Sequence, residues 1–388
     1  METLPERIIA LRELYRAVRA EVERWPGMAL DRMPSATVVV SGAYAAARIP
    51  QPLLRDRATM RIPRRALGAG IEAASIGART GIFVRRQSIT GLDVDITACY
   101  PVGGALAGVQ DFLTREVVAH HVCGRRGLDE LSYGVRSAVE AGLLEHPDAW
   151  RSLAFLAKVR PSGDVLTVPV ELFGTEATLT APVASGSREF WTTGFDLAAA
   201  AIEDLDRGGP GSVPEMTEAW ALAFGNRLRG LRPVTFPGGW IWDPRKPSTC
   251  RSNDGRTWGN LYPLLAAVRL AAKTNPELSP QERVRMRGML KVASVAGVFG
   301  MFSATTPIAD VKPGMSHRVI TADGVITVDQ GTPERPGPWA FPPAAALVEG
   351  SGRLLLTLLM HEVRRRGGSM VQVDTDGGFI ATRSEASA

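Results

Sequence analysis

The sequence predicts an α+β protein that combines an antiparallel sheet with an α-helical hairpin. Two strand-like stretches, at 87–101 and 370–382, carry acidic residues between alternating apolar ones, a pattern typical of strands. The clearest helices, at about 258–274 and 280–300, are joined only by TNPELSP. So short a connection makes two helices an antiparallel hairpin.

Length and composition place the chain among globular proteins. Its 388 residues suffice for two or three structural units, and 45% hydrophobic with 22% charged residues is ordinary for that class. No apolar run reaches membrane-spanning length, and residues 1–25 are charged and amphipathic, unlike a signal peptide. We therefore expect no membrane partner and a cytoplasmic location.

Charge and cysteines narrow the function classes. The net charge of +5 and the pI near 9.4 fit a polyanionic partner, although many basic proteins bind none. Cys99, Cys123 and Cys250 are far apart and lack CxxC spacing, so we expect free thiols. His120, His121 and Cys123, on one expected helix turn, offer too few ligands for zinc. A P-loop and a strand-linked GxGxxG are both missing.

The N-terminal half is expected to mix helices and strands. The expected elements are an amphipathic helix at 3–24, a β-rich segment at 36–49, a turn at 75–81, a buried strand within 87–101, helices near 109–124, 128–144 and 147–157, and a hairpin at 155–172. A Gly/Pro-rich break at 206–214 indicates a linker or an exposed loop.

The C-terminal half has clearer boundaries. Ser279 is placed to cap the second helix of the helical hairpin, and Pro280 suits its first turn. A small hairpin at 317–328 turns on Asp-Gly, and a long helix at about 342–366 ends before Gly367 and Gly368.

The stretch MVQVDTDGGFIAT, at 370–382, places Asp374 and Asp376 one residue apart between two strand-like runs. Asp-Gly-Gly between alternating apolar residues is a strong hairpin-turn signal, which is one interpretation. Carboxylates held on a rigid hairpin also suit a divalent metal that carries phosphates, which is the other. The two interpretations are compatible.

Several short motifs resemble those of family B DNA polymerases, in the order of that family. DITACYP at 95–101 resembles the first polymerase motif, KVASVAGVFG at 291–300 the second, and VDTDG at 373–377 the third. SIGART at 75–80 is similar to the element that precedes the first motif in protein-primed members, and 336–368 to the palm helix. The resemblance is closest to the protein-primed and actinobacterial-like branch.

The resemblance implies a polymerase palm with an antiparallel sheet, plus α-helical fingers, in a bacterial or phage-encoded protein. It divides the chain into an N-terminal helical and β segment at 1–69, palm with the first motif at 70–110, a palm insertion with helices and a β-hairpin at 111–257, the fingers hairpin at 258–304, and palm with the third motif at 305–388. The implied partners are primer–template DNA and dNTPs.

The implied chemistry is two-metal nucleotidyl transfer. Two Mg²⁺ ions, or Mn²⁺ in their place, would be bridged by Asp95 and Asp376, with Asp374 as a supporting acid, because carboxylates on adjacent strands can share such ions. All three are therefore expected to be catalytic metal ligands.

Nucleotide contacts are expected from the fingers and from the first motif. Lys291 is the best candidate for the triphosphate, with Arg287 one turn earlier, and Arg269 and Lys273 on the other helix. The alternative for all four is a solvated helix surface. Tyr100 falls where the family places a ring beneath the incoming sugar, although it could instead pack in the palm core, and Phe299 stands where the second motif has tyrosine.

The chain departs from the family pattern at several positions. Val295 and Ala296 replace the Asn-Ser of the second motif, Gly377 replaces the serine of the third, and Ser75 replaces the upstream tyrosine. About 70 residues precede the match, too few for the proofreading exonuclease, and nothing after 388 can build a thumb. We therefore expect a minimal or split enzyme, a fragment or a degenerate copy, with a separate subunit as a possible source of a thumb or an exonuclease.

Two rival functions remain open at this point. One is a polymerase-like subunit that binds nucleic acid but catalyses weakly because its second motif is altered. Retention of all three acids argues against it, because like charges held close together repel one another and a purely structural palm has no reason to keep them. The other is a metal-dependent glycosyltransferase of the DxD type, a class that requires neither the Asp-x4-Tyr-Pro strand nor a lysine-bearing helix.

Overall fold

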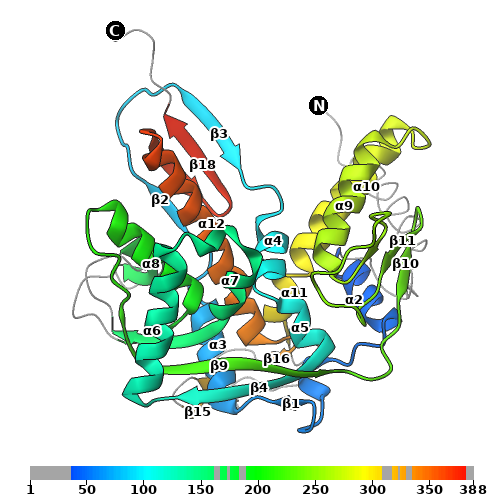
Figure 1. The fold of residues 1–388 in the computed structure, drawn as a ribbon, viewed down its shortest axis with the longest axis horizontal. Coiled ribbons are helices and arrows are strands. Elements are labelled where there is room, and N and C mark those ends of the chain that lie inside the picture. The colour runs from blue at the N-terminus through cyan, green and yellow to red at the C-terminus, as the bar shows by residue number, and fades with distance from the viewer. Residues whose placement is uncertain are drawn as a thin grey trace.

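The computed structural model describes residues 36–160, 167–172, 175–182, 189–307, 317–321, 324–328 and 334–381. The fold is α+β with antiparallel sheets, as predicted. The long helix α12 (Pro342–Arg365) runs through the centre, between a five-stranded sheet and a four-stranded sheet (Figure 1). The helical hairpin of α9 and α10 stands apart from both sheets (Figure 1).

The five-stranded sheet has the order β1-β4-β9-β5-β8 and is antiparallel except for the parallel pair β1–β4. Its strands are β1 (Met60–Arg61), β4 (Arg115–Val122), β9 (Glu215–Arg227), β5 (Phe155–Arg160) and β8 (Phe190–Thr193). Helices α3 (Arg64–Ala74), α6 (Arg125–Glu140) and α8 (Gly194–Asp206) are among those that pack on this sheet or on α12.

The four-stranded sheet, here named the acidic sheet, has the antiparallel order β2-β17-β18-β3. Its strands are β2 (Thr80–Ile82), β17 (Ser369–Asp374), β18 (Gly377–Ala381) and β3 (Gly91–Asp95). Met370 and Val373 of β17 pack against Leu356 and Met360 of α12 in one buried cluster. Burial of these apolar side chains fixes the sheet on the helix.

The helical hairpin consists of α9 (Leu261–Thr274) and α10 (Pro280–Ala296). Ser279 and Glu282 form a capping box at the start of α10, with a Ser279 N–H to Glu282 carboxylate distance of 2.8 Å. The base of the hairpin joins the main core, where the hydroxyls of Tyr262 and Tyr44 are hydrogen-bonded at 3.0 Å. The predicted cap and hairpin are confirmed.

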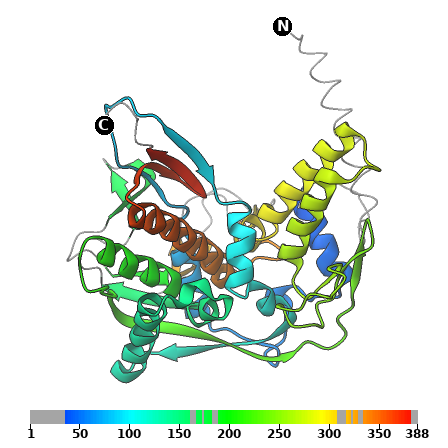
Figure 2. The ribbon, with the colours of Figure 1, turned by 45° about the horizontal axis from the view of Figure 1, so that its top comes forward.

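The remaining elements are short apart from α2. They are α2 (Ala36–Ala46), η1 (Pro52–Leu54), α4 (Cys99–Leu106), α5 (Val109–Thr114), η2 (Leu143–Glu145), α7 (Pro147–Ser152), β6 (Thr167–Leu172), β7 (Thr175–Pro182), β10 (Val234–Phe236), β11 (Trp240–Trp242), β12 (Thr257–Trp258), α11 (Gly300–Ser303), β13 (Thr305–Pro307), β14 (His317–Thr321), β15 (Gly324–Val328) and β16 (Glu334–Pro336). Helix α4 lies between the acidic sheet and the helical hairpin in both views (Figures 1 and 2).

A buried ion pair ties α12 to α8 beneath the acidic sheet. The Arg353 guanidinium donates to both oxygens of Asp196, at 2.6 and 3.0 Å, and the two side chains are 3% and 8% exposed. Burial opposes ionisation of Asp196, but Arg353 and the Thr193 hydroxyl lower its pKa below the usual value. Arg353 also donates to the carbonyl of Gly77, so the pair anchors the loop that leads into β2.

Two local predictions in the first hundred residues are wrong. The β-rich segment at 36–49 contains the helix α2, because Val39, Val40, Ala43 and Tyr44 are buried on one helical face, and this tertiary burial overrides strand propensity. The strand at 87–101 shrinks to β3 at one edge of the acidic sheet and is not buried, with Leu92 60% exposed. Helix α4 follows it.

Predictions for the middle of the chain are wrong in their pairing. The expected helix at 109–124 is helix only in α5 and continues as strand β4, and that at 147–157 divides into α7 and β5. The expected hairpin at 155–172 does not form, because β5 pairs with β8 and β9 while β6 pairs with β7. Long-range sheet pairing decided these segments.

Other predictions are confirmed or fall outside the described residues. The hairpin of β14 and β15, the long helix α12 and the final hairpin of β17 and β18 are present, and the segment at 206–214 is a loop between α8 and β9. The helix expected at 3–24 lies outside the described residues. The five-segment division of the chain stays a prediction.

Helix α12 is unusual in its apolar character. Within the described residues it is the one helix long and apolar enough to cross a membrane by length and composition, and 83% of its apolar window is buried inside the protein. A mostly buried helix in the core of a protein has the same length and composition, so these two features alone are weak evidence for a membrane span.

Glu349, one turn before Arg353, is expected to make stability depend on pH. Burial is the main cause that raises its pKa from 4.5 to about 7, and its Oε2 has no hydrogen-bond partner, with Arg353 Nη1 3.8 Å away. Between these values the native state binds more protons than the unfolded chain, so stability falls as pH rises from 4.5 to 7.

Glu349→Gln should therefore raise the free energy of unfolding at pH 8 by about 1–3 kcal/mol, and this gain should disappear near pH 4.5. Urea denaturation across this pH range measures the effect, with Glu140→Gln on the exposed face of α6 as the control. A gain of equal size at both pH values would contradict the assignment.

Candidate active site

The strand register of the acidic sheet brings its three sequence-predicted aspartates to one end. Asp95, the last residue of β3, pairs with Gly377, the first residue of β18. Gly377 also pairs with Asp374, the last residue of β17. Asp376 immediately precedes Gly377, and its carbonyl accepts the N–H of Ile96 at 2.8 Å. Asp95, Asp374 and Asp376 therefore lie at the same end of the strands of the acidic sheet, and this group of three is named the acidic edge.

A tight turn sets the positions of Asp374 and Asp376. The Asp376 N–H donates to the Asp374 carbonyl at 2.7 Å, and Thr375 between them has a left-handed φ of 60°. The Thr375 N–H donates to the Arg79 carbonyl at 2.9 Å, and its hydroxyl to Asp374 Oδ1 at 2.9 Å. A non-glycine residue in this conformation is strained, and such strain clusters at functional sites.

Gly377 permits the close approach of β3 and β18. A Cβ at this position would lie 2.3 Å from the Val94 carbonyl oxygen and 3.2 Å from the Cα of Asp95. A serine, which the resembling motif has here, would push the two strands apart. The departure from the motif thus follows from the tight spacing between Asp95 and the turn.

The carboxylates repel one another, and this repulsion contributes to a raised pKa of Asp376. Burial and then the charge of Asp95 raise the pKa of Asp376, with a smaller contribution from Asp374. Burial, Asp376 and Asp95 together raise the pKa of the Cys99 thiol to about 12. The sheet edge is therefore a concentration of negative potential.

Lys291 on α10 is the cation that acts on this edge. It is exposed, and its charge opposes the rise in the pKa of Asp376. Lys273 is also exposed, and Arg269 and Arg287 are half-buried. Within the described residues none of the four forms an ion pair with a carboxylate.

The rings of Tyr100 and Phe299 pack together between the acidic sheet and the helical hairpin. The Tyr100 ring, on the first turn of α4, is 7% exposed and lies 5.0 Å from the Phe299 ring, measured between centroids. A Cβ on Gly352 of α12 would come within 3.2 Å of the Tyr100 ring. The ring is therefore packed in the core between α12 and the end of the helical hairpin, and it follows Asp95 by one short loop.

The acidic edge fits a divalent metal that also binds phosphate. Carboxylate oxygens are the ligands Mg²⁺ prefers, and the mutual repulsion at Asp376 is what a cation would relieve. In the described part of the chain, no group of three His, Cys, Asp or Glu side chains is arranged to hold a metal on its own. Mg²⁺ usually takes one or two protein carboxylates and completes its shell with water and substrate phosphates.

Sequence reasoning missed the residues that support the edge. Cys99 is buried, and its thiol is within electrostatic reach of Asp95 and Asp376. Arg79 holds the turn through its carbonyl and donates its guanidinium to the Thr357 hydroxyl at 2.9 Å, with Glu203 as its ion-pair partner. SIGART contains Arg79, so the signal for it lay in the motif, but its partners come from distant helices.

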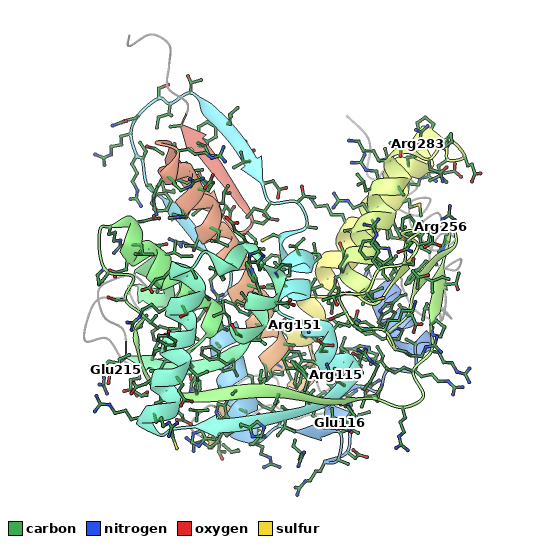
Figure 3. The ribbon with its side chains drawn as sticks, viewed as in Figure 1. Arg115, Glu116, Arg151, Glu215, Arg256 and Arg283 are labelled. Carbon is green, nitrogen blue, oxygen red and sulfur yellow. The ribbon has the colours of Figure 1, made fainter. Side chains whose placement is uncertain are left out.

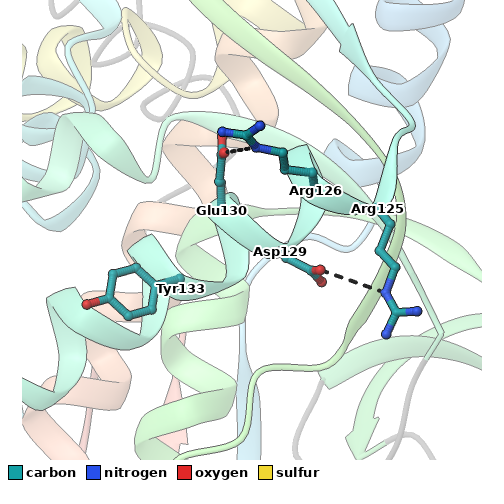
Figure 4. A pocket seen from close by; sticks show the side chains of 5 residues that line it. All are labelled: Arg125, Arg126, Asp129, Glu130 and Tyr133. Carbon is teal, nitrogen blue, oxygen red and sulfur yellow. Dashed lines mark hydrogen bonds and ion pairs between the residues drawn. The ribbon is translucent and has the colours of Figure 1, made fainter.

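Other polar clusters lie away from the acidic edge. His121 is on strand β4, not on a helix turn, where it contacts Glu218 at 2.7 Å and stacks on Trp220. A shallow depression on α6 is lined by one helix alone and contains its i,i+4 pairs (Figure 4). Its lining residues are Arg125, Arg126, Asp129, Glu130 and Tyr133. Pairs this exposed contribute little.

Comparison with known proteins gives a distant structural likeness. No protein-family model and no curated protein matches the chain. The chain is similar to Phi29 DNA polymerase in its orthorhombic crystal form, with a TM-score of 0.43 and 11% identity over 92% of this chain and 49% of that chain. The Phi29 DNA polymerase complex with primer–template DNA and incoming nucleotide substrates gives 0.41 and 11% over the same shares.

The chain thus spans about half the length of these solved structures. The activity of this chain has to be argued from its own residues.

The charges around Asp376 should be separable by mutation. Asp95→Asn removes the nearest repulsion, so the pKa of Asp376 should fall, whereas Lys291→Ala removes an attraction, so it should rise. Carboxyl NMR titration measures both shifts, with Asp93→Asn, two residue pairs further along β3, as the control. Shifts of the same sign in the two variants would refute this arrangement.

Proposed function

We propose that this chain is a DNA polymerase that adds deoxynucleotides to a primer on a template by two-metal nucleotidyl transfer. The observation that supports it most is the pairing of Asp95 with Gly377, which sets Asp95 beside Asp376, the carboxylate on which the charge of Lys291 acts. Acids on two strands and a cation on a separate helical arm are the groups that this reaction needs.

Asp95 and Asp376 would hold two Mg²⁺ ions, with Mn²⁺ as a substitute, and Asp374 would support them. Bound there, the ions would supply Lewis-acid activation of the primer 3′-hydroxyl and charge neutralisation on the triphosphate. The chain itself holds the acids in place through the Thr375 turn and the Arg79 carbonyl. This preorganisation reduces the reorganisation needed at reaction.

Lys291 would contact the triphosphate from α10. Its ammonium is exposed and already within electrostatic reach of Asp376. The main charges that shift the pKa of Asp376 include Lys291 but not Arg287, Arg269 or Lys273. We assign these last three to the approach path of the polyanionic substrate, where unpaired cations steer association.

Tyr100 would exclude the ribose 2′-hydroxyl. The packing of its ring on Phe299 and Gly352 fixes it one loop after Asp95. A fixed ring discriminates by steric exclusion, because it cannot move aside for an added hydroxyl. Half-buried Val295 and Ala296 stand where the resembling motif has Asn-Ser, so selectivity would depend on the ring more than on hydrogen bonds.

Primer extension tests the acids directly. Asp95→Asn and Asp376→Asn should each reduce Mg²⁺-dependent incorporation of dNTPs at least 100-fold, because each removes a metal ligand, while Asp93→Asn should retain activity. Thermal unfolding should show that all three variants fold. Robust synthesis by Asp376→Asn would refute the site, and transfer from UDP-sugars instead of dNTPs would favour a glycosyltransferase.

Replacement of Tyr100 tests the sugar selectivity. Tyr100→Val should keep dNTP incorporation within about tenfold and raise rNTP incorporation by considerably more, since a clash of a few kcal/mol is relieved. Phe299→Val, which loosens the same packing without removing the ring beneath the sugar, is the matched control. If both variants lose dNTP and rNTP incorporation equally, Tyr100 has a packing role alone.

A further inference from the structure

A basic cavity lies outside the acidic edge, where α5, α7, β4 and β9 meet the loop after β11. It has a volume of about 270 Å³. The residues that matter for its chemistry are Asp111, Arg115, Arg151, Arg227, Ser248 and Thr249. Figure 3 places Arg151 and Arg115 in the central part of the molecule, below α4 in that view.

The cavity has an excess of positive charge. Arg151 is 3.4 Å from Asp111, whose side chain is 4% exposed, and it donates to the Ser248 hydroxyl. Arg115 and Arg227 form no ion pair with any carboxylate in the described part of the chain. Three arginines and one aspartate therefore line the cavity.

The two unpaired arginines are held by backbone carbonyls. Arg115 Nε donates to the Gly225 carbonyl at 2.9 Å, and Arg227 Nη1 to that of Pro244. Each guanidinium has five N–H donors, and within the described residues each uses one of them in these hydrogen bonds. Burial is the main cause that lowers the pKa of Arg227; Asp111 and, more weakly, Asp243 oppose the shift, and the charge of Arg115 adds to it.

We propose that this cavity binds a phosphate group. Guanidinium forks match the oxygens of phosphate, and the hydroxyls of Ser248 and Thr249, which also line the cavity, add donors. Asp111 orients Arg151 and keeps the net charge at a level that suits a mono- or dianion. The group could belong to a nucleic-acid backbone or to free phosphate.

A nucleic-acid backbone is the source that the position favours, and this part rests on the proposed function. Asp111 and Arg151 adjoin Gly108, where a Cβ would lie 3.7 Å from Asp111 and 3.9 Å from Arg151. Gly108 follows α4, which begins four residues after Asp95 and is about 12 Å long. A strand that leaves the acidic edge along α4 would reach the cavity within a few nucleotides.

Inorganic phosphate is the probe for the cavity itself. At matched ionic strength, phosphate should raise the melting temperature of the full chain more than chloride or acetate does, because a ligand of the native state stabilises it by RT ln(1 + [L]/Kd). Arg151→Gln should lose at least half of this excess shift, and Arg151→Lys should retain part of it. Arg126→Gln on exposed α6 is the control.

Loss of Arg151 leaves Asp111 buried without its partner, so the double variant Arg151→Gln/Asp111→Asn guards against misfolding. It should fold and still lack the excess shift. No phosphate-specific shift in the wild type, or equal shifts in the double variant and the wild type, would overturn the proposal.

Duplex DNA binding separates the two sources. In an Asp95→Asn background, which removes catalysis, the slope of log K against log salt should fall by about 1 when Arg151→Gln is added. An unchanged slope with an intact phosphate shift would assign the cavity to free phosphate and overturn the nucleic-acid source. A changed slope without any primer extension by the unmutated chain would overturn the polymerase proposal and leave the cavity's assignment standing.

Discussion

The candidate active site depends on one buried ion pair, between Arg353 and Asp196. Two charges that are 3% and 8% exposed persist only because the guanidinium and carboxylate pair in a bidentate manner and Thr192 and Thr193 complete the carboxylate's hydrogen bonds. The pair joins α12 to α8 and, through the Gly77 carbonyl, to the loop that leads into β2. That loop carries Arg79, whose carbonyl accepts the N–H of Thr375 in the turn. The positions of the aspartates therefore depend on the Arg353–Asp196 ion pair, which is not itself part of the acidic edge.

The acidic sheet and the helical hairpin are two separate arms of the structure with α4 between them. The acidic sheet is fixed on α12 by apolar packing, and the hairpin joins the core through the Tyr44–Tyr262 contact. Helix α4 packs against α12, α9 and α10, and its first turn carries Tyr100 next to Phe299. A change in the angle between the acidic sheet and the helical hairpin would therefore first alter the packing of Tyr100 and the distance between Lys291 and the aspartates of the acidic edge.

Local signals predicted the parts of the fold whose partners are near in sequence. The turn after Asp374 and the cap at Ser279 are present, because Asp-Gly-Gly and a capping box act within a few residues. The register that sets Asp95 opposite Gly377 could be predicted only through the resemblance, since their separation exceeds 280 residues. Pairings of β5, and the convergence of Arg115, Arg151 and Arg227, had no local signal at all.

The distribution of charge separates what stabilises this protein from what it does. Arg353 and Asp196 are paired and deeply buried, so they serve the fold. The charges of Asp95 and Asp374 raise the pKa of Asp376, and neutral residues in their place would remove this repulsion. Within the described residues, Arg115 and Arg227 form no ion pair with a carboxylate. Within the described residues these charges of opposite sign lie at two places connected by α4 and α5, where they do not improve packing. The two proposals give them a common use: metal-bound phosphates at the acidic edge and a phosphate group in the basic cavity.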